Sequence, residues 1–178
     1  LPADRAQLLN LEATLDAAVG AVSGLYHPAF DAAGNPITTA RRLRLVRRGR
    51  FRWNGVVHED LETTGDYTVL DSDIAVTHRK PTTEAGPSTR NLDIYRRHFH
   101  SGRPMRPTDV FHYARELQMH HQFAEAIGYH RQFLETGHPD VELILFTLHN
   151  LATCYHMTGD LDGEWDCTLQ SLAYDVPR

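Results

Sequence analysis

The architecture of the second half of the chain follows from residues 119–135, MHHQFAEAIGYHRQFLE. Apolar side chains recur there at intervals of three or four residues, which is the spacing of one face of an α-helix. Phe123, Ala126, Ile127 and Leu134 make this face. The polar run before Phe123 is typical of a turn. The stretch therefore predicts a turn followed by a helix over residues 123–136.

The same pattern returns 38 residues later, in residues 150–177. The aligned pairs are Ala114 with Ala152, His121 with Gly159, Phe123 with Leu161, and Leu134 with Leu172. The other expected helices cover residues 91–101, 108–120, 141–157 and 161–174. Two helix pairs of similar sequence are expected to stack and to bury a shared apolar stripe.

Each helix pair resembles a tetratricopeptide repeat, with small residues at the helix crossing of the first pair. The second pair departs from this pattern, because Glu164 and Trp165 stand where Ala126 and Ile127 stand in the first. That difference predicts a wider or more exposed crossing. The resemblance implies a concave surface that binds a peptide, although helix packing alone explains the same pattern.

The first half of the chain carries strand and turn signals after a first helix, which is expected over residues 2–17. Two strands are expected over residues 22–29 and 37–48. They are joined by a turn at residues 31–35, where Gly and Asn accept positive φ. A third strand is expected over residues 74–78. A small sheet followed by helices is therefore expected.

The segment RLRLVRR, residues 42–48, places several arginines on one face of a strand. Leu43 and Leu45 point one way, and Arg42, Arg44 and Arg47 point the other. Such a face is either solvated or a wall that meets phosphate or carboxylate groups. The second alternative follows from the guanidinium group, which binds both kinds of anion through two parallel hydrogen bonds.

The stretch FRWNGVVHED, residues 51–60, contains an Asn-Gly pair that predicts a tight turn. His58, Glu59 and Asp60 then bring one imidazole and two carboxylates together within three residues. These groups are the usual proton acceptors of enzymes, and imidazole is also a common metal ligand. The stretch is therefore the main candidate for chemistry in this chain.

Taken in order, five segments resemble the family 2 glycosyltransferases that carry a C-terminal tetratricopeptide region, and the resemblance covers nearly the whole chain. The segments are RLRLVRR, RWNGVVHEDLE, DIAVTHRK, RNLDIYRRH and PTDVFHYARELQMHHQFAEAIGYHRQFLE. The resemblance implies an α/β fold that is the C-terminal part of a Rossmann-like, A-type glycosyltransferase domain, followed by an all-α tetratricopeptide-like region.

The implied boundaries are an acceptor-side half of the catalytic domain over residues 1–82, a linker and connecting helix over 83–106, and helical repeats over 107–178. The Pro-, Thr- and Gly-rich residues 81–88 are typical of a linker at the first boundary.

The implied function is the inverting transfer of a hexose from a nucleotide sugar to a peptide, a protein or another acceptor. Some bacterial relatives glycosylate peptides, including the cysteines of bacteriocin precursors. The donor-binding half, with an Asp-x-Asp motif that holds Mn²⁺ or Mg²⁺, is expected to precede Leu1, so the segment alone is expected to be inactive. Asp71-Ser-Asp73 comes too late for that motif and is expected to be a turn.

The implied catalytic base is Glu59, with Asp60 as the second choice. In an alternating strand Glu59 points away from both neighbours, so the three residues have different tasks. His58 is expected to ligate the metal or to contact the diphosphate, unless it is a structural histidine. The other expected contacts are Trp53 to a sugar or acceptor, unless it packs in the core, and Arg44 and Arg47 to the diphosphate. His78 is expected to meet the diphosphate together with Arg79 or Lys80, unless it is a structural histidine.

Composition excludes some classes of function. The formal charge of −5 argues against nonspecific binding to nucleic acid or to an anionic membrane. No apolar run is long enough to span a bilayer. Cys154 and Cys167 do not make a disulfide framework, which favours a reduced, cytoplasmic setting in which both are buried as small apolar residues. The alternative function is a tetratricopeptide interaction module without chemistry.

Overall fold

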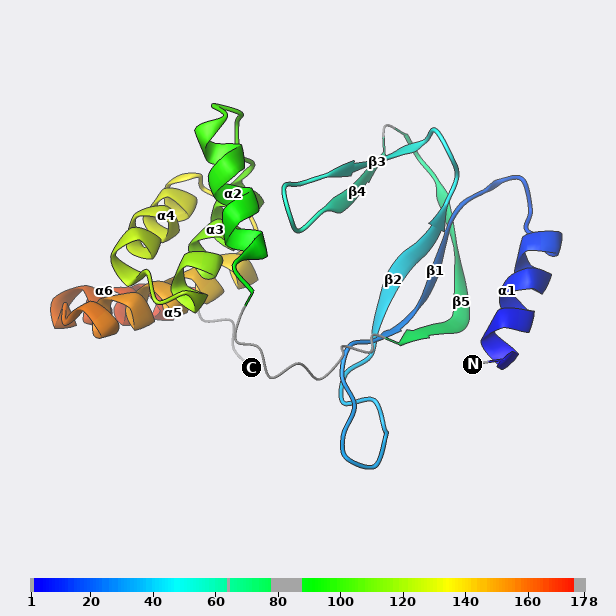
Figure 1. Cartoon of the computed structure of the whole chain (residues 1–178), viewed down its shortest axis with the longest axis horizontal. Helices are drawn as coiled ribbons and strands as arrows, with labels where there is room; N and C mark the ends of the chain where they lie inside the picture. Colours follow the sequence, from blue (N-terminus) through cyan, green and yellow to red (C-terminus); the bar gives the residue numbers. More distant parts are fainter. Residues whose placement is uncertain (1, 64, 78–87, 175–178) are drawn as a thin grey trace. The chain divides into compact units, whose positions relative to one another are not determined.

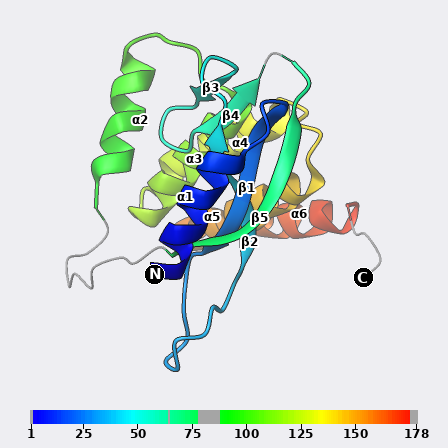
Figure 2. The same cartoon turned by 90° about the vertical axis from the view of Figure 1, so that its right-hand side faces the viewer.

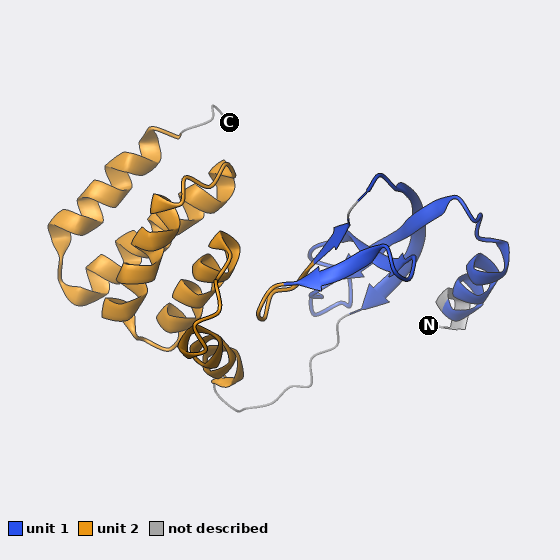
Figure 3. Cartoon of the chain, turned by 90° about the horizontal axis from the view of Figure 1, so that it is seen from above, with its two compact units in different colours: residues 1–54, 61–84 blue, residues 55–60, 85–178 orange. Residues whose placement is uncertain are grey.

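The computed structural model describes residues 2–63, 65–77 and 88–174. They form two compact units (Figure 3): unit 1 comprises Leu1–Asn54 and Leu61–Glu84, and unit 2 comprises Gly55–Asp60 and Ala85–Arg178. The chain is mixed α/β, as predicted at that level. His78, Arg79 and residues 81–87 of the predicted linker lie outside the described residues.

Unit 1 is built on a three-stranded sheet of order β2-β1-β5 (Figures 1 and 2). The strands are β1 (Val19–His27), β2 (Ala40–Val46) and β5 (Thr68–Thr77). β1 pairs antiparallel with β2 and parallel with β5. As the central strand it satisfies its backbone groups on both sides, and Ala21 and Val22 are buried in it. The remaining elements of this unit are α1 (Pro2–Thr14), β3 (Phe51–Asn54) and β4 (Asp60–Thr63).

The third strand is longer than predicted, and the turn expected at Asp71-Ser-Asp73 is wrong. Both aspartates lie inside β5, where parallel pairing with β1 outweighs their local preference for turns. Ser23 Oγ donates a hydrogen bond to Asp71 at 2.5 Å, and Arg41 forms an ion pair with Asp73 at 3.0 Å. The two carboxylates therefore bind side chains of β1 and β2.

Unit 2 is helical, and the five helices predicted for it are confirmed to within one or two residues at each end. They are α2 (Arg90–His100), α3 (Pro107–Met119), α4 (Phe123–Glu135), α5 (Val141–Thr158) and α6 (Leu161–Leu172). From α2 onward, each helix packs on the next along the chain. The main core joins residues from four helices: Leu92, Tyr95, Tyr113, Leu117, Ala126 and Cys154. Helix α2 therefore belongs to the same core as the repeats.

The predicted 38-residue repeat is visible in the backbone. His121 and Gly159, which this offset aligns, are both left-handed, with φ of 58° and 81°. The N–H groups of His121 and Gln122 donate to the carbonyls of Gln118 and Leu117, and the equivalent groups of Gly159 and Asp160 repeat both bonds. The first helix of each pair therefore ends in the same six-residue turn, which leads into the second helix. The two helix pairs, α3–α4 and α5–α6, are called the first and second hairpin below.

Both cysteines are buried, as predicted, and burial raises the pKa of Cys154 to about 11. Within the described ranges, none of the helices combines the length and the apolar character needed to cross a bilayer.

His130 of α4 makes unit 2 sensitive to acid. Its side chain is fully buried, and neither ring nitrogen has a hydrogen-bond partner among the described residues. Burial, assisted by the nearby Arg115, lowers its pKa from 6.5 to about 4. Because the unfolded chain takes up the proton first, the free energy of unfolding falls as the pH drops from about 6.5 towards 4.

We expect His130→Leu to remove this acid-induced loss of unfolding free energy, which amounts to about 2 kcal/mol at pH 5. Urea unfolding of the two proteins at pH 5 and pH 8 measures the difference. His149→Leu, at an exposed position of α5, is the control and should keep the parental pH dependence. An unchanged pH slope in the His130 variant would show that the imidazole is not buried in a neutral form.

Candidate functional site

The loop Gly55–Asp60 joins β3 to β4 and belongs to unit 2. The tight turn predicted at Asn54-Gly55 is wrong: Asn54 is the last residue of β3, and a longer bend over residues 55–59 leads to β4, with Gly55 at a φ of 133°. Glu59 is not part of an alternating strand, because β4 begins only at Asp60. The reason is that the loop takes its hydrogen bonds from helix α3 rather than from a strand partner. Its side chains are therefore directed by these contacts and not by the pleat of a sheet.

Asp109 and Arg106 at the start of α3 hold this loop. Asp109 accepts hydrogen bonds from Arg106 Nε at 2.9 Å and Arg106 Nη2 at 3.1 Å, a two-point contact. The same carboxylate accepts a bond from the Val56 N–H at 3.2 Å. Arg106 Nη2 also reaches the His58 carbonyl at 3.5 Å. One ion pair therefore binds both the first turn of α3 and the backbone of the loop.

The Asp109 carboxylate stays ionised although the residue is only 2% exposed. Burial by itself raises the pKa of a carboxyl group. The hydrogen bonds from Arg106 and from the Val56 N–H outweigh that effect, and the pKa of Asp109 lies below its ordinary value. The loop is thus attached to a permanent negative charge inside the protein.

His58 stacks on His112 of α3, with ring centroids 3.9 Å apart and an angle of 26° between the planes. Burial, and next the proximity of His58, lowers the pKa of His112 to about 4. His112 is therefore neutral at physiological pH, and its ring is an uncharged surface for the exposed imidazole of His58. The stacking gives His58 a structural contact. This is the role that the sequence analysis named as the alternative to a metal ligand.

Glu59 lies between two residues that have partners. His58 stacks on His112, and Asp60 forms an ion pair with Arg106 Nη1 at 3.7 Å. Glu59 is exposed, and none of the hydrogen bonds and ion pairs of the described residues involves its carboxylate. Among the described residues, the loop therefore presents one unpaired carboxylate, and the residue on each side of it is held by a contact with α3 or with Arg106.

Gly55 is required where Arg106 passes the loop. A Cβ at this position would lie 2.5 Å from Arg106 Nη2 and 2.6 Å from the His58 carbonyl oxygen, in addition to the strain of a positive φ. We expect Gly55→Ala to lower the free energy of unfolding of unit 2 by about 3 kcal/mol. Urea unfolding followed by the fluorescence of Trp165, in a Trp53→Phe background, measures this value.

Gly137→Ala is the matched control, since Gly137 also has a positive φ, of 63°, but would place its Cβ in open space. It is expected to cost about 1 kcal/mol from backbone strain alone. Equal losses in the two variants would contradict close packing of Arg106 on the loop.

Three further predicted site residues lie in unit 1. Trp53 of β3 is 65% exposed, so the alternative of core packing is wrong for it. The Arg44 guanidinium lies 4.8 Å from the centre of the Tyr26 ring. Arg47 donates hydrogen bonds to the backbone carbonyls of Ala17 and Val19. The two arginines thus have partners within the sheet. The predicted diphosphate contacts His78 and Arg79 lie outside the described residues.

The described residues do not form a complete metal site. Nowhere among them do three or more His, Cys, Asp or Glu side chains gather in a way that could hold an ion. His58, the predicted ligand, has the neutral His112 ring against it, and the neighbouring Asp60 is paired with Arg106. An ion at this loop would need its other ligands from elsewhere.

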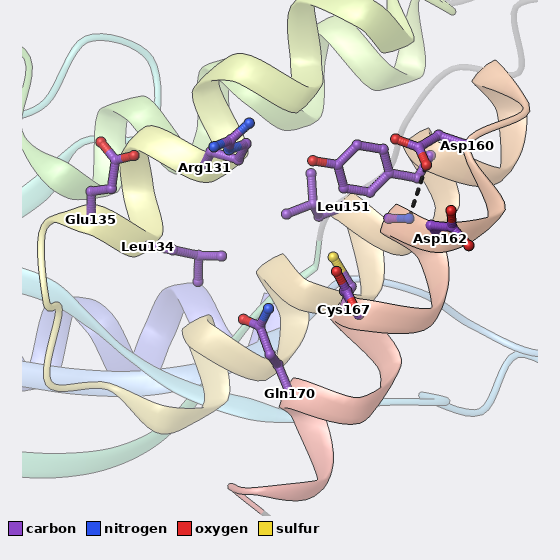
Figure 4. A pocket seen from close by; sticks show the side chains of 11 residues that line it. Arg131, Leu134, Glu135, Leu151, Asp160, Asp162, Cys167 and Gln170 are labelled. Atoms are coloured by element: carbon purple, nitrogen blue, oxygen red, sulfur yellow. Dashed lines mark hydrogen bonds between the residues drawn. The ribbon is translucent and has the colours of Figure 1, made fainter.

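A second candidate site is a hollow on unit 2 between α4 and α6, with a volume of about 530 Å³ (Figure 4). Leu151 and Tyr155 of α5 line it together with charged residues of the two flanking helices. These are Arg131, Glu135, Asp160, Asp162 and Asp166. Asp160 is already bound, since it accepts a hydrogen bond from the Gly163 N–H at 2.9 Å. The hollow offers a polar, mainly acidic surface for binding.

Arg106, Asp109 and His112 have roles at the loop that were not predicted from the sequence. The one signal in the sequence is the step Arg-Pro-Thr-Asp into α3, in which Arg106 is the N-cap residue and its backbone N–H donates to the Asp109 carboxylate. That signal predicts the helix start and gives no indication of the loop. No protein-family model matches the chain, and no curated protein matches it at a significant level.

Proposed function

We propose that this chain is the acceptor-side and C-terminal segment of an inverting, nucleotide-sugar-dependent glycosyltransferase of the family 2 type. The observation that carries the proposal is the unpaired, exposed carboxylate of Glu59 on a loop held by Arg106 and Asp109. A general base must be accessible to its substrate, and its position must be fixed before the reaction.

The proposed step uses Glu59 as the proton acceptor. The acceptor's O–H, N–H or S–H gives its proton to the Glu59 carboxylate, and the acceptor atom bonds to the anomeric carbon. The bond from that carbon to the diphosphate oxygen breaks with its electron pair, so that a nucleoside diphosphate leaves and the configuration inverts. A divalent ion, Mn²⁺ or Mg²⁺, held largely outside this segment, would supply charge neutralisation for that leaving group.

Other residues have supporting roles in the proposal. Trp53 offers an exposed aromatic face to a sugar or acceptor, and His58, Arg44, Arg47, His78 and Arg79 are the proposed contacts to the diphosphate. His58 is also the proposed metal ligand of this segment. In this proposal unit 1 is the end of a Rossmann-like, A-type domain in a cytoplasmic bacterial enzyme.

The experiment is a transfer assay on the protein that carries this segment behind its donor-binding half. Nucleotide sugars of several hexoses are incubated with Mn²⁺ or Mg²⁺ and a peptide acceptor, and release of nucleoside diphosphate is measured. Transfer is expected from the joined protein and not from the 178-residue chain alone. If the joined protein shows no transfer and no binding of any nucleotide sugar, the transferase proposal fails.

The second candidate is a tetratricopeptide-type interaction module without chemistry. The 38-residue repeat favours it, because the same backbone turn joins the two helices of each hairpin and the first hairpin packs on the second. A protein that captures a peptide but leaves every nucleotide sugar intact would support this candidate over the first.

A further inference from the structure

The hollow between α4 and α6 has polar walls and an apolar floor (Figure 4). The α4 wall has Arg131, Leu134 and Glu135, and the wall at α6 has Asp160, Asp162, Asp166 and Gln170. Leu151 of α5 and Cys167 of α6 line it from below, and each is only 3% exposed. The hollow therefore combines a buried apolar floor with four carboxylates and one guanidinium.

Most of these carboxylates have no partner within the described part of the chain. Asp160 accepts a hydrogen bond from a backbone N–H. Glu135, Asp162 and Asp166 take part in none of the hydrogen bonds and ion pairs of the described residues. Asp162 and Asp166 stand four residues apart on one face of α6, where like charges repel each other. A cation in the hollow would therefore be attracted by several charges at once.

The thiol on the floor of the hollow lies in the field of these charges. Burial, and next the negative charges of Asp166 and Asp160, raise the pKa of Cys167 above its ordinary value. Negative charge is therefore in excess on this side of α6, although Arg131 lines the same hollow.

The same arrangement occurs one helix earlier, and there it includes a bound arginine. Helix α2 packs on α3 and α3 packs on α4, as α4 packs on α5 and α5 on α6. Arg96 of α2 donates a hydrogen bond from Nη2 to the Gln122 side chain at 2.6 Å and forms an ion pair with Glu125 at 3.7 Å. Tyr113 of α3 donates to the same Glu125 at 3.3 Å. The start of α4 is therefore bound by a guanidinium that reaches across from the helix before α3.

The 38-residue offset transfers the partners of this arginine to the start of α6. Gln122 and Glu125 correspond to Asp160 and Gly163. The glutamate has no direct counterpart, but two aspartates close to Gly163 on α6 line the hollow. The second copy thus offers a guanidinium more negative charge than the first.

Helix α4 supplies no guanidinium to these aspartates. The 38-residue offset places Leu134 at the position of Arg96. Arg131, one turn before Leu134, forms no ion pair among the described residues. The chain therefore contains the arrangement twice: once with an arginine of its own bound at the helix start, and once with unpaired carboxylates around an apolar floor.

We propose that the hollow between α4 and α6 binds an arginine side chain on an exposed basic segment of a partner protein. The guanidinium contacts the carboxylates of Asp162 and Asp166, and the methylene stem lies on Leu151. A peptide segment fits better than free arginine, because the free amino acid would bring its own carboxylate into an acidic hollow. The inference holds for either candidate function, since it involves no residue of the loop Gly55–Asp60.

The test titrates the 178-residue chain into a short peptide in which two arginines flank a leucine, labelled with an uncharged fluorophore. Fluorescence anisotropy at physiological salt is expected to show saturable binding with a Kd on the order of 100 µM. Citrulline in place of arginine keeps the shape and removes the charge, and that peptide is expected to bind at least about tenfold more weakly. The lysine peptide should bind about threefold more weakly than the arginine peptide. Free arginine, at about tenfold above that Kd, should not displace the peptide.

Two substitutions with the same change of charge locate the site. Asp166→Asn removes a carboxylate of the hollow and is expected to weaken binding about tenfold. Glu142→Gln removes an exposed carboxylate of α5 that does not line the hollow, and it is expected to weaken binding less than about twofold. Asp162→Asn serves as a second hollow variant, and circular dichroism checks that all variants remain helical.

Several results would overturn the proposal. The first is the absence of saturable binding. Equal binding of the arginine and citrulline peptides would assign the interaction to apolar contacts, and equal binding of the lysine peptide would remove the preference for a guanidinium. Equal weakening by Asp166→Asn and Glu142→Gln would reduce the effect to the net charge of the chain. Displacement of the peptide by free arginine would make the occupant a small guanidinium compound and not a partner segment.

Discussion

In the proposed transferase, which joins this segment to a donor-binding half, replacing Glu59 by Gln is expected to lower kcat for sugar transfer by about a thousandfold. General-base catalysis contributes roughly 10²- to 10⁴-fold to a rate. A glutamine amide has nearly the same shape as the carboxylate but does not accept a proton. Nucleotide-sugar binding is expected to persist, because the proposed base acts on the acceptor.

The structure explains why this variant should fold normally. Glu59 is exposed, and its carboxylate takes part in none of the bonds that hold the loop. The loop is held by the Val56 N–H, the His58 carbonyl and the Arg106–Asp109 pair, all of which remain in Glu59→Gln. The free energy of unfolding is expected to change by less than about 0.5 kcal/mol. A loss of turnover is then a loss of chemistry.

Asp60→Asn is the matched control, since it makes the same chemical change one residue away. Asp60 forms an exposed ion pair with Arg106, and such pairs contribute little to stability. We expect its kcat to stay within about threefold of the parent. The opposite outcome, with turnover lost in Asp60→Asn and kept in Glu59→Gln, would make Asp60 the base. Full turnover in both variants would remove the catalytic role from this loop.

The helices of unit 2 could be predicted from the sequence because their signals are local. The apolar spacing around Phe123 and the aligned pair His121 and Gly159 report on residues a few positions apart, and a helix is built from such contacts. The 38-residue repeat was predictable for the same reason. The ends of α3 and α5 are marked by one turn that occurs twice, with a left-handed residue at the same place in each copy.

The attachment of the loop could not be predicted, because it depends on residues far apart in the chain. The Val56 N–H binds a carboxylate 53 residues away, and no local pattern selects Asp109 among the acidic residues of the chain. Asp71 and Asp73 illustrate the same limit for β5. Their preference for turns is real, but β1 supplies backbone partners that only the folded sheet provides.

The repeat also shows how a small change in sequence converts core into surface. The first hairpin has aromatic residues at Phe111 and Phe133, and α5 covers them. The second hairpin has His149 and Ser171 at these positions, and they line an open groove. The backbone turn is retained while the apolar contacts are reduced, so the repeat keeps its shape while its second copy lines an open groove.

Replacing Arg106 by Ala is expected to lower the free energy of unfolding of unit 2 by about 3 kcal/mol at pH 7. The substitution leaves the Asp109 carboxylate, which is 2% exposed, without its guanidinium partner. Removing one member of a buried pair is more costly than removing both, because the remaining charge stays desolvated. Urea unfolding followed by Trp165, in the Trp53→Phe background, reports on unit 2. Arg103→Ala, at an exposed position three residues earlier, is the control and should cost less than about 0.5 kcal/mol.

The pH dependence separates loss of this pair from loss of packing. In the parent, the ion pair lowers the Asp109 pKa below its value of about 3.9 in the unfolded chain. The stability that the pair contributes is complete above about pH 3.9 and is lost as the pH falls through the lower pKa of the folded protein. In Arg106→Ala, burial dominates and raises the Asp109 pKa. Protonation of Asp109 then removes the buried charge and stabilises the variant. The stability difference between parent and variant is therefore expected to shrink as the pH falls from 7 towards 4. The acid sensitivity of His130 is common to both proteins and cancels in this difference. A stability difference that stays constant with pH would assign the cost to lost side-chain packing and would leave the loop without its electrostatic attachment.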